Sequence, residues 1–372
     1  MDIEKSESEK RATRYQRVRR ALSASEYLLN LTLLLVLLLT GWSVSIRIAA
    51  EHVSPRPSLA LLVYLVIFGA IARVLGLPLE WVSGFWLERR YGLSNLTFLG
   101  WAKDQLKALA VGGVLGAAAL EFIYWSIRKW PAYWWVVCGG AFVCFIVLVA
   151  NLAPILLFPI FFKFEPLENA SLTNRLLALC QRARTRVRGV FEWKLSEKTK
   201  KANAALAGLG NTRRIIVSDT LIQNFTEDEI EVVLAHELGH HVHRHLARGL
   251  AVQTAAAFLG FYLIHLSLEK LSGLFGFRAP ADFANLPLLL LVGACLSLVL
   301  LPVANGHSRA MERQADAYAL GSVPFPAAFI SSMEKLARLN LAERRPPRWI
   351  EFLFHSHPSI EKRIAFARRS GA

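Results

Sequence analysis

The stretch His236-Glu237-Leu238-Gly239-His240 lies inside a run of residues that predicts a helix. Thr226-Glu227-Asp228-Glu229 has the pattern of a capping box at its start, and Ile230, Val233 and Leu234 give it an apolar face. Positions four apart lie on one face of a helix, about one turn apart. Two imidazoles at that spacing can bind one Zn²⁺, and the glutamate after the first imidazole can reach a water on that metal. Because this motif also occurs by chance, the rest of the chain has to support the interpretation.

The composition is typical of a membrane protein. Of 372 residues, 54% are hydrophobic and only 19% are charged, below the roughly 25% of soluble domains, and the mean hydropathy is +0.37. A helix that crosses a hydrocarbon layer of roughly 30 Å needs about 20 apolar residues. Six segments meet this requirement: 27–49, 58–75, 106–127, 132–158, 250–271 and 286–303. The second can continue to Phe85, since Pro78 would kink a membrane helix without forbidding it.

The basic residues are unevenly distributed, and the formal net charge is +15. Basic clusters precede the first span, separate the second span from the third, and occur in the hydrophilic stretch 163–248 and at the C-terminus. By the positive-inside rule, both termini and the hydrophilic stretch are expected in the cytoplasm. No nucleic-acid-binding motif accompanies the charge, so we expect contact with the lipid bilayer and no nucleic-acid partner. The first apolar run is expected to be a signal anchor rather than a cleaved signal peptide.

Five parts follow from these patterns. They are a basic cytoplasmic tail (1–26), an N-terminal transmembrane region of four helices (27–158), a soluble part with the histidine motif (159–248), transmembrane helices five and six (249–304), and a C-terminal helical part that completes the metal site (305–372). We therefore predict a mainly α-helical, polytopic membrane protein with about six transmembrane helices.

The soluble part has the pattern of a small sheet followed by the motif helix. Residues 172–187 predict an amphipathic helix, and 190–195, 202–209 and 213–218 predict strands, with a turn at Gly210-Asn211. The motif helix comes next and is expected to run nearly straight into the fifth span. This order is typical of a zincin-type (gluzincin) catalytic domain with a small β-sheet.

Two histidines leave a catalytic zinc site incomplete, because such sites normally have three protein ligands and a water. The four cysteines form no CxxC pair, so thiolate ligands are not expected. The candidate third ligand is Glu312, in a predicted helix that follows the sixth span and ends near Gly321. Asp316 shares its face and could orient a metal-bound imidazole, and Arg309 could meet Asp316 on the same helix. Charges placed so close to a membrane span are expected to face a polar cavity.

Three further histidines, His241, His243 and His245, follow the motif. His241 and His245 are also four residues apart, but no glutamate follows His241, so this pair lacks a base. We interpret all three as ordinary polar residues at the membrane surface, with adventitious metal binding as the alternative.

A series of further motifs extends over nearly the whole chain from about Leu75. In chain order it comprises Glu88-Arg89-Arg90-Tyr91-Gly92-Leu93-Ser94, Asp104, Lys107, Pro154, Phe164-Glu165-Pro166-Leu167, Asn203-Ala204, Gly208, Arg214-Ile215-Ile216-Val217-Ser218-Asp219-Thr220-Leu221, the histidine motif, Ser308-Arg309 with Glu312 and Ala315-Asp316, His357-Pro358 and Arg363. With this series the chain resembles the membrane zinc peptidases of family M48, and within it the type I CAAX prenyl proteases.

The resemblance implies a role for each matching residue in zinc-dependent peptide hydrolysis. His236, His240 and Glu312 would bind one zinc ion per chain, and Glu237 would be the general base and acid. The substrate of such an enzyme would be a peptide or protein, either prenylated or inserted in the membrane.

The resemblance also implies roles for residues outside the zinc motif. Asn203 and Ala204 would lie on an edge strand that pairs with the substrate backbone. His357 and Arg363 would act near the zinc, with His357 as a candidate donor to the tetrahedral oxyanion. From the residues alone, Asn203 is no more than a turn residue and His357 no more than a residue at a helix start.

The chain departs from the eukaryotic members in two ways. It is shorter, and we predict six spans where those members have seven. Both differences indicate a bacterial relative in the inner membrane, whose substrate need not be prenylated. The alternative enzyme is a quality-control peptidase that cleaves damaged membrane proteins and needs no prenyl group.

A non-enzymatic transporter or zinc-binding membrane scaffold is the alternative from a different class. Binding zinc alone would not require Glu237. Away from their ends the spans carry almost no charge, with Arg73 and Glu121 as the main exceptions, which makes an ion or proton relay unfavourable. Both observations favour the peptidase.

Overall fold

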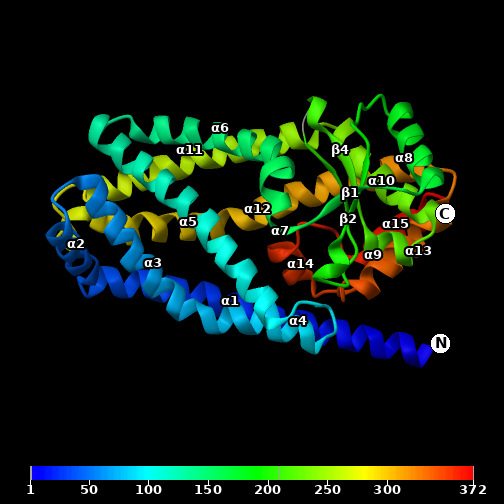
Figure 1. Cartoon of the computed structure of the whole chain (residues 1–372), viewed down its shortest axis with the longest axis horizontal. Helices are drawn as coiled ribbons and strands as arrows, with labels where there is room; N and C mark the ends of the chain where they lie inside the picture. The colour runs from blue at the N-terminus through cyan, green and yellow to red at the C-terminus, as the bar shows by residue number, and fades with distance from the viewer. Residues whose placement is uncertain (1, 209, 372) are drawn as a thin grey trace.

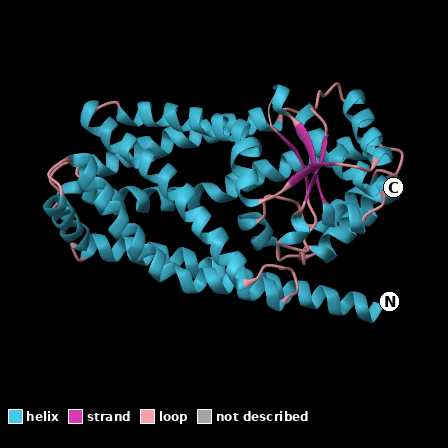
Figure 2. Cartoon of the chain, in the orientation of Figure 1, coloured by secondary structure: helices cyan, strands magenta, loops and turns pink. Residues whose placement is uncertain are grey.

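The computed structural model describes residues 2–208 and 210–371. Long helices form an elongated bundle at one end, and shorter helices surround a small sheet at the other (Figures 1 and 2). The helices are α1 Asp2–Leu39, α2 Trp42–Val53, α3 Pro57–Trp81, α4 Leu87–Arg90, α5 Phe98–Lys129, α6 Trp134–Leu152, α7 Phe158–Phe161, α8 Ala170–Arg182, α9 Asp219–Asn224, α10 Glu227–Val242, α11 His245–Leu271, α12 Leu286–Ser322, α13 Pro326–Leu339, α14 Arg348–Phe354 and α15 Ile360–Arg369.

Six helical segments of the described residues are long and apolar enough to cross a membrane, which confirms the predicted number. They run Glu7–Leu39, Pro57–Arg90, Phe98–Lys129, Trp134–Phe161, His245–Phe275 and Phe283–Ser322. The second passes Pro78 and reaches Phe85, as expected, and continues to Arg90. Many large apolar side chains on these helices are exposed, as a surface that faces lipid requires.

The first span differs from the prediction, because the expected helix 27–49 is interrupted. α1 ends at Leu39, Gly41 has a φ of 73°, and α2 begins at Trp42. Glycine has no Cβ and reaches positive φ at little cost, so the chain turns there. At its other end α1 extends back to Asp2, so the predicted basic tail is helical. Arg20 of this tail forms a 2.7 Å ion pair with Glu343 in the C-terminal part.

A four-stranded mixed sheet lies in the smaller part, in the order β1-β2-β4-β3. The strands are β1 Phe164–Pro166, β2 Val190–Trp193, β3 Ala204–Ala207 and β4 Arg214–Ser218. β2 and β4 are parallel, and the two outer pairs are antiparallel. The three predicted strands are present as β2, β3 and β4. β1 was not predicted, because a strand of three residues is too short to show an alternating pattern. β3 is an edge strand that pairs with β4 on one side only.

Helix α10 lies at the centre of the smaller part. The predicted capping box is confirmed: Thr226 Oγ1 accepts a hydrogen bond from the Glu229 amide at 3.3 Å, and the Glu229 carboxylate accepts one from the Thr226 amide at 2.8 Å. Ile230, Leu234 and Leu238 are buried in a core shared with α8, α13 and the sheet. This burial holds the motif helix in place against its neighbours.

The motif helix does not run straight into the fifth span, so that prediction is wrong. α10 ends at Val242, Arg244 takes the left-handed conformation with a φ of 54° and a ψ of 39°, and α11 begins at His245. Arginine pays a steric cost in this conformation, roughly 1–2 kcal/mol. The spacing of apolar residues along the chain does not predict such a break.

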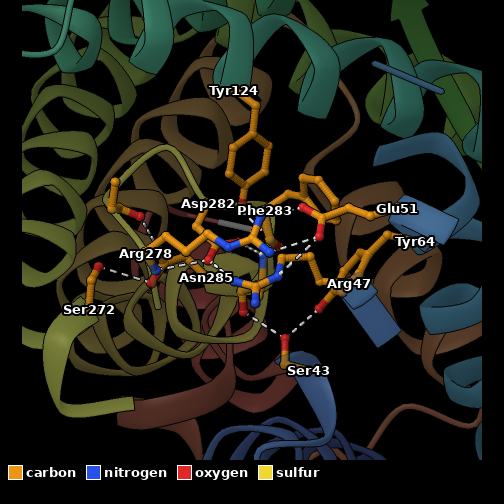
Figure 3. A network of polar contacts seen from close by, with 12 residues as sticks. Ser43, Arg47, Glu51, Tyr64, Tyr124, Ser272, Arg278, Asp282, Phe283 and Asn285 are labelled. Carbon is orange, nitrogen blue, oxygen red and sulfur yellow. Dashed lines mark hydrogen bonds and ion pairs between the residues drawn. The ribbon is translucent and has the colours of Figure 1, made fainter. Parts of the chain in front are cut away.

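A partly buried polar network lies at the end of the bundle away from the sheet (Figures 1 and 3). Arg47 of α2 is 5% exposed and forms an ion pair with Asp282, which precedes α12. Beside them, Arg278 donates two hydrogen bonds to the carboxylate of Glu51, at 2.6 and 2.9 Å. The network ties α2 to the segment between α11 and α12.

Candidate metal centre

Helices α10 and α12 bring the three predicted metal ligands together. His236 and His240 lie one turn apart on α10, with their Nε2 atoms 3.2 Å from each other. From α12, Oε2 of Glu312 lies 3.3 Å from Nε2 of His236, and Oε1 lies 3.3 Å from Nε2 of His240. One donor atom from each of the three side chains lies within 4.8 Å of the other two.

The donor set fits a zinc ion. Two imidazoles and one carboxylate are the protein ligands of one type of catalytic zinc site, which keeps a further position for water or substrate. Oε2 of Glu312 is buried and makes no hydrogen bond, an unfavourable state for a carboxylate oxygen unless a cation compensates it.

The contact between α10 and α12 depends on Gly239, the residue before His240. A Cβ placed on Gly239 would lie 2.9 Å from Cα of Ala315, which is fully buried. Contacts this short are essentially not found in proteins, so any side chain here would push the two helices apart. The absence of a side chain at Gly239 therefore lets Glu312 reach the two histidines.

A second carboxylate contacts His236 from the side opposite to Glu312. Nδ1 of His236 is 2.9 Å from Oδ1 of Asp316. Arg363 of α15 holds the same carboxylate through Nε at 2.9 Å and Nη2 at 2.6 Å, and both side chains are buried. When Nδ1–H donates to Asp316, Nε2 presents its lone pair towards Glu312, as a metal ligand must.

The charges around α10 shift the protonation of two motif residues. Burial opposes the charged form of His236, but its contacts with the carboxylates of Asp316 and Glu312 outweigh this effect and raise the pKa of His236 to about 9. Burial raises the pKa of Glu237 above its ordinary value, although the neighbouring imidazoles act in the opposite direction. A carboxyl group with a raised pKa is suited to proton transfer near neutral pH.

A cavity of about 370 Å³ opens beside these residues. Glu237 and His236 line it on one side, and Asn203 and Ala204 line it at the start of β3. Its remaining wall is largely apolar and includes Val233 of α10 and Phe329, Met333, Leu336 and Ala337 of α13. The cavity thus has a polar side near the metal centre and an apolar side.

His357 also lines the cavity. Its Nε2 is 3.3 Å from Oε1 of Glu312, and its side chain is 61% exposed. Ser356 Oγ lies 2.8 Å from its Nδ1. The ring is therefore within reach of both the metal centre and a molecule in the cavity.

Known proteins match the chain over almost its whole length. A model of peptidase family M48 matches residues 166–370, and a model of the CAAX prenyl protease N-terminal part, described as five membrane helices, matches residues 2–163. The chain belongs to peptidase family M48. It is an integral membrane metalloendopeptidase with several membrane spans, similar to the CAAX prenyl proteases. Its substrates are peptides or proteins.

Three relatives illustrate the match. The uncharacterized metalloprotease YhfN of Bacillus subtilis is 30% identical over 362 residues, which cover 96% of this chain and 85% of the relative. CAAX prenyl protease 1 of Saccharomyces cerevisiae is 28% identical over 82% of this chain and 71% of its own length. The crystal structure of S. mikatae Ste24p has the same fold, with a TM-score of 0.87 and 24% identity, covering 97% of this chain and 89% of that one.

Arg309 lies elsewhere than the sequence suggested for this M48 peptidase. Its guanidinium donates hydrogen bonds to the backbone carbonyls of Glu351 at 2.9 Å and His355 at 2.6 Å, whereas Asp316 contacts His236 and Arg363. Glu351 lies in the last turn of α14 and His355 directly follows it, at the end of the helix where backbone carbonyls accept additional donors. Arg309 thus anchors the segment that leads to His357 and does not support Asp316.

The interpretation of His245 as a residue at the membrane surface is also wrong. His245 is only 3% exposed and lies with Nδ1 3.0 Å from Nδ1 of His240. Gln314, which the sequence did not single out, lies 3.1 Å from its Nε2. His245 follows His240 by five residues, a spacing that does not place two side chains on one face of a helix.

Proposed function

We propose that this M48 peptidase hydrolyses peptide bonds with one zinc ion held by His236, His240 and Glu312. The observation that carries the proposal is the convergence of these three side chains beside Glu237, at the polar side of a cavity. Zinc, when bound, polarises the carbonyl of the scissile bond and lowers the pKa of water towards about 7.

Glu237 takes up and returns the proton of the reaction. It accepts a proton from the attacking water and delivers it to the leaving amine. Its position in the cavity wall and its raised pKa support this role. Arg363 acts by holding Asp316 against His236, and the exposed His357 ring donates a hydrogen bond to the oxyanion of the tetrahedral intermediate.

The substrate binds as an extended strand beside β3. The edge of this strand that faces away from β4 has no strand partner among the described residues, and Asn203 and Ala204 at its start line the cavity. Backbone hydrogen bonds at such an edge give affinity with few demands on sequence.

The apolar side of the cavity selects an aliphatic residue next to the scissile bond. Phe329, Met333 and Leu336 of α13 form a wall that an aliphatic side chain can bury against. A CAAX-terminated peptide supplies aliphatic residues after its cysteine, and several relatives bear the name CAAX prenyl protease 1. We therefore place such peptides first among the substrate candidates.

The catalytic part faces the cytoplasm of a bacterial inner membrane in this proposal. The basic N-terminal part of α1 and the basic C-terminal helix α15 lie at the same end as the sheet (Figure 1), which is the end that the positive-inside rule assigns to the cytoplasm. The 30% identity to a Bacillus subtilis metalloprotease supports a bacterial setting.

The decisive experiment is mass spectrometry of two matched CAAX-terminated peptides, one farnesylated and one bare, incubated with the purified protein. Chelator-treated protein and Glu237→Ala protein serve as blanks. We expect cleavage that requires zinc and Glu237, after the modified cysteine of the farnesylated peptide.

Two other outcomes are informative. Equal cleavage of both peptides would contradict a prenyl requirement and favour a quality-control peptidase. Cleavage that persists in pure Glu237→Ala protein would exclude Glu237 from the proton transfer.

A further inference from the structure

The break between α10 and α11 places His245 directly behind a metal-ligand candidate. In an unbroken helix, a residue five positions after His240 would point about 140° away from it. Because Arg244 is left-handed, the helix is broken there, and the His245 ring lies against the ring of His240. An arginine held in this costly conformation indicates that the surrounding contacts fix the turn.

The contacts of His245 form a chain that ends on α12, the helix that also carries Glu312. Nδ1 of His245 is 3.0 Å from Nδ1 of His240, with the two ring planes at 76° to each other. On its other side, Nε2 is 3.1 Å from Oε1 of Gln314. Both ring nitrogens of this buried histidine therefore have partners.

The partner of Gln314 fixes the direction of these hydrogen bonds. Nη1 of Arg248 also lies 3.0 Å from the same Gln314 atom, and a guanidinium can only donate, so that atom is the amide oxygen. An oxygen accepts from His245, which places the proton of the neutral ring on Nε2 and the lone pair on Nδ1. Nδ1 of His245 then accepts a hydrogen bond from Nδ1–H of His240.

The Nε2 atom of His240 is consequently the one without a proton, and it is the atom that faces Glu312 and His236. We propose that His245 is a positioning residue for His240: it fixes the tautomer and ring plane in which Nε2 of His240 can bind the metal. This inference rests on the proposed function, since it takes His240 to be a zinc ligand.

The two histidine ligands thus have different supports. Nδ1 of His236 faces the carboxylate of Asp316, whereas Nδ1 of His240 faces a second imidazole held by an amide. Mutation of a residue that is hydrogen-bonded to a metal ligand typically lowers metal affinity 10–100-fold. The contribution of His245 should lie in that range.

The test measures zinc affinity by competition with a chromophoric chelator, using the full-length protein in detergent micelles. His245→Leu removes the acceptor behind His240, and we expect affinity to fall about 10–100-fold. His245→Asn keeps an acceptor oxygen close to the position of Nδ1, and we expect it to recover most of the lost affinity. His241→Leu makes the same chemical change without the contact to His240 and should leave affinity unchanged.

A second variant does not disturb a buried position. Gln314 is exposed, and Gln314→Leu removes the acceptor that fixes the tautomer of His245. We expect a weaker loss of zinc affinity and, in the cobalt-loaded protein, a shifted visible spectrum that His241→Leu does not show.

Several results would overturn the inference. One such result is unchanged zinc affinity in both His245→Leu and Gln314→Leu protein. Another is an equal loss of zinc affinity in His245→Leu and His245→Asn protein, which would indicate a packing effect. His240→Ala serves to separate this failure from that of the proposed function. If His240→Ala leaves zinc affinity intact, the ligand assignment fails as well; if it abolishes binding while His245→Leu does not, only the positioning role fails.

Discussion

Three carboxylates around the metal centre have different partners, and these partners indicate what each can do. Glu312 meets two imidazoles, and Asp316 lies between His236 and Arg363. Glu237 lines the cavity, and burial raises its pKa. The first two are held in place by their contacts, whereas Glu237 is the one placed to exchange a proton with a bound molecule.

Glu237→Gln keeps the size of the side chain and removes its capacity to accept a proton. We expect turnover to fall by about 10²–10⁴-fold while zinc content remains at that of the unmodified protein. Peptide cleavage followed by mass spectrometry, with metal analysis of the same sample, checks both parts. Loss of zinc in this variant would mean that Glu237 supports the site rather than the proton transfer.

Glu229 provides a pH-dependent contribution to stability outside the metal centre. Burial opposes its ionisation, but hydrogen bonds from Lys335 at 2.6 Å, Ser331 at 2.7 Å and the Thr226 amide outweigh this and lower its pKa. A carboxyl whose folded-state pKa is lowered stabilises the fold above its unfolded pKa of about 4.3, and this stabilisation is lost as the pH falls through the folded value.

Glu229→Gln should therefore lower the free energy of unfolding at pH 7, by about 1–3 kcal/mol. The difference from the unmodified protein should shrink steadily as the pH falls below about 4. Chemical unfolding in detergent at several pH values measures it, with the exposed Glu168→Gln as the control. A difference that does not change with pH would argue against an ionic origin.

At the scale of whole elements, the metal centre is a product of how closely two helices approach. α10 carries two of the ligand candidates and α12 the third, and Gly239 contacts Ala315 where the helices meet. The positions of the ligand candidates therefore depend on a residue that cannot bind metal itself.

Gly239→Ala should separate α10 from α12 and weaken zinc binding, even though alanine favours a helix by about 1 kcal/mol over glycine. We expect a lower unfolding temperature and at least a tenfold loss of zinc affinity. Gly249→Ala is the matched control, because a Cβ at Gly249 in α11 meets no other atom within 4 Å. If Gly239→Ala binds zinc normally, the two helices can adjust without moving the ligands.

At the scale of the whole molecule, α12 links both ends of the protein. It begins beside the buried network of Arg47 and Asp282 and reaches Glu312 after 26 residues of helix, about 40 Å further on. The network and the three metal-ligand candidates thus lie near opposite ends of the molecule (Figure 1). Damage to the network should therefore affect stability more than metal binding.

Arg47→Met would leave the buried carboxylate of Asp282 without its ion-pair partner. Breaking a buried pair by removing one partner costs about 3–5 kcal/mol, so we expect a clearly lower unfolding temperature. The double variant Arg47→Met with Asp282→Asn should recover much of that loss, since no unpaired charge remains. Thermal unfolding of both proteins in detergent, with zinc content measured on the folded fraction, checks the expectation; a double variant no better than the single one would contradict it.

Much of the architecture could be predicted because its signals are local. The number of spans follows from runs of apolar residues, and the start of α10 follows from a capping box four residues long. His236 and His240 are brought together by helix geometry alone, and the motif series led to Glu312 and to peptidase family M48.

The sequence by itself determined the six spans, the M48 family and the three metal-ligand candidates, because hydropathy, helical spacing and motifs are carried by residues close together in the chain. Only the tertiary structure decided that Arg309 contacts the segment before His357, that Gly239 lies against Ala315 where α10 meets α12, and that His245 contacts His240. These three depend on a contact between distant segments or on a single left-handed residue, Arg244, and neither leaves a periodic signal in the sequence.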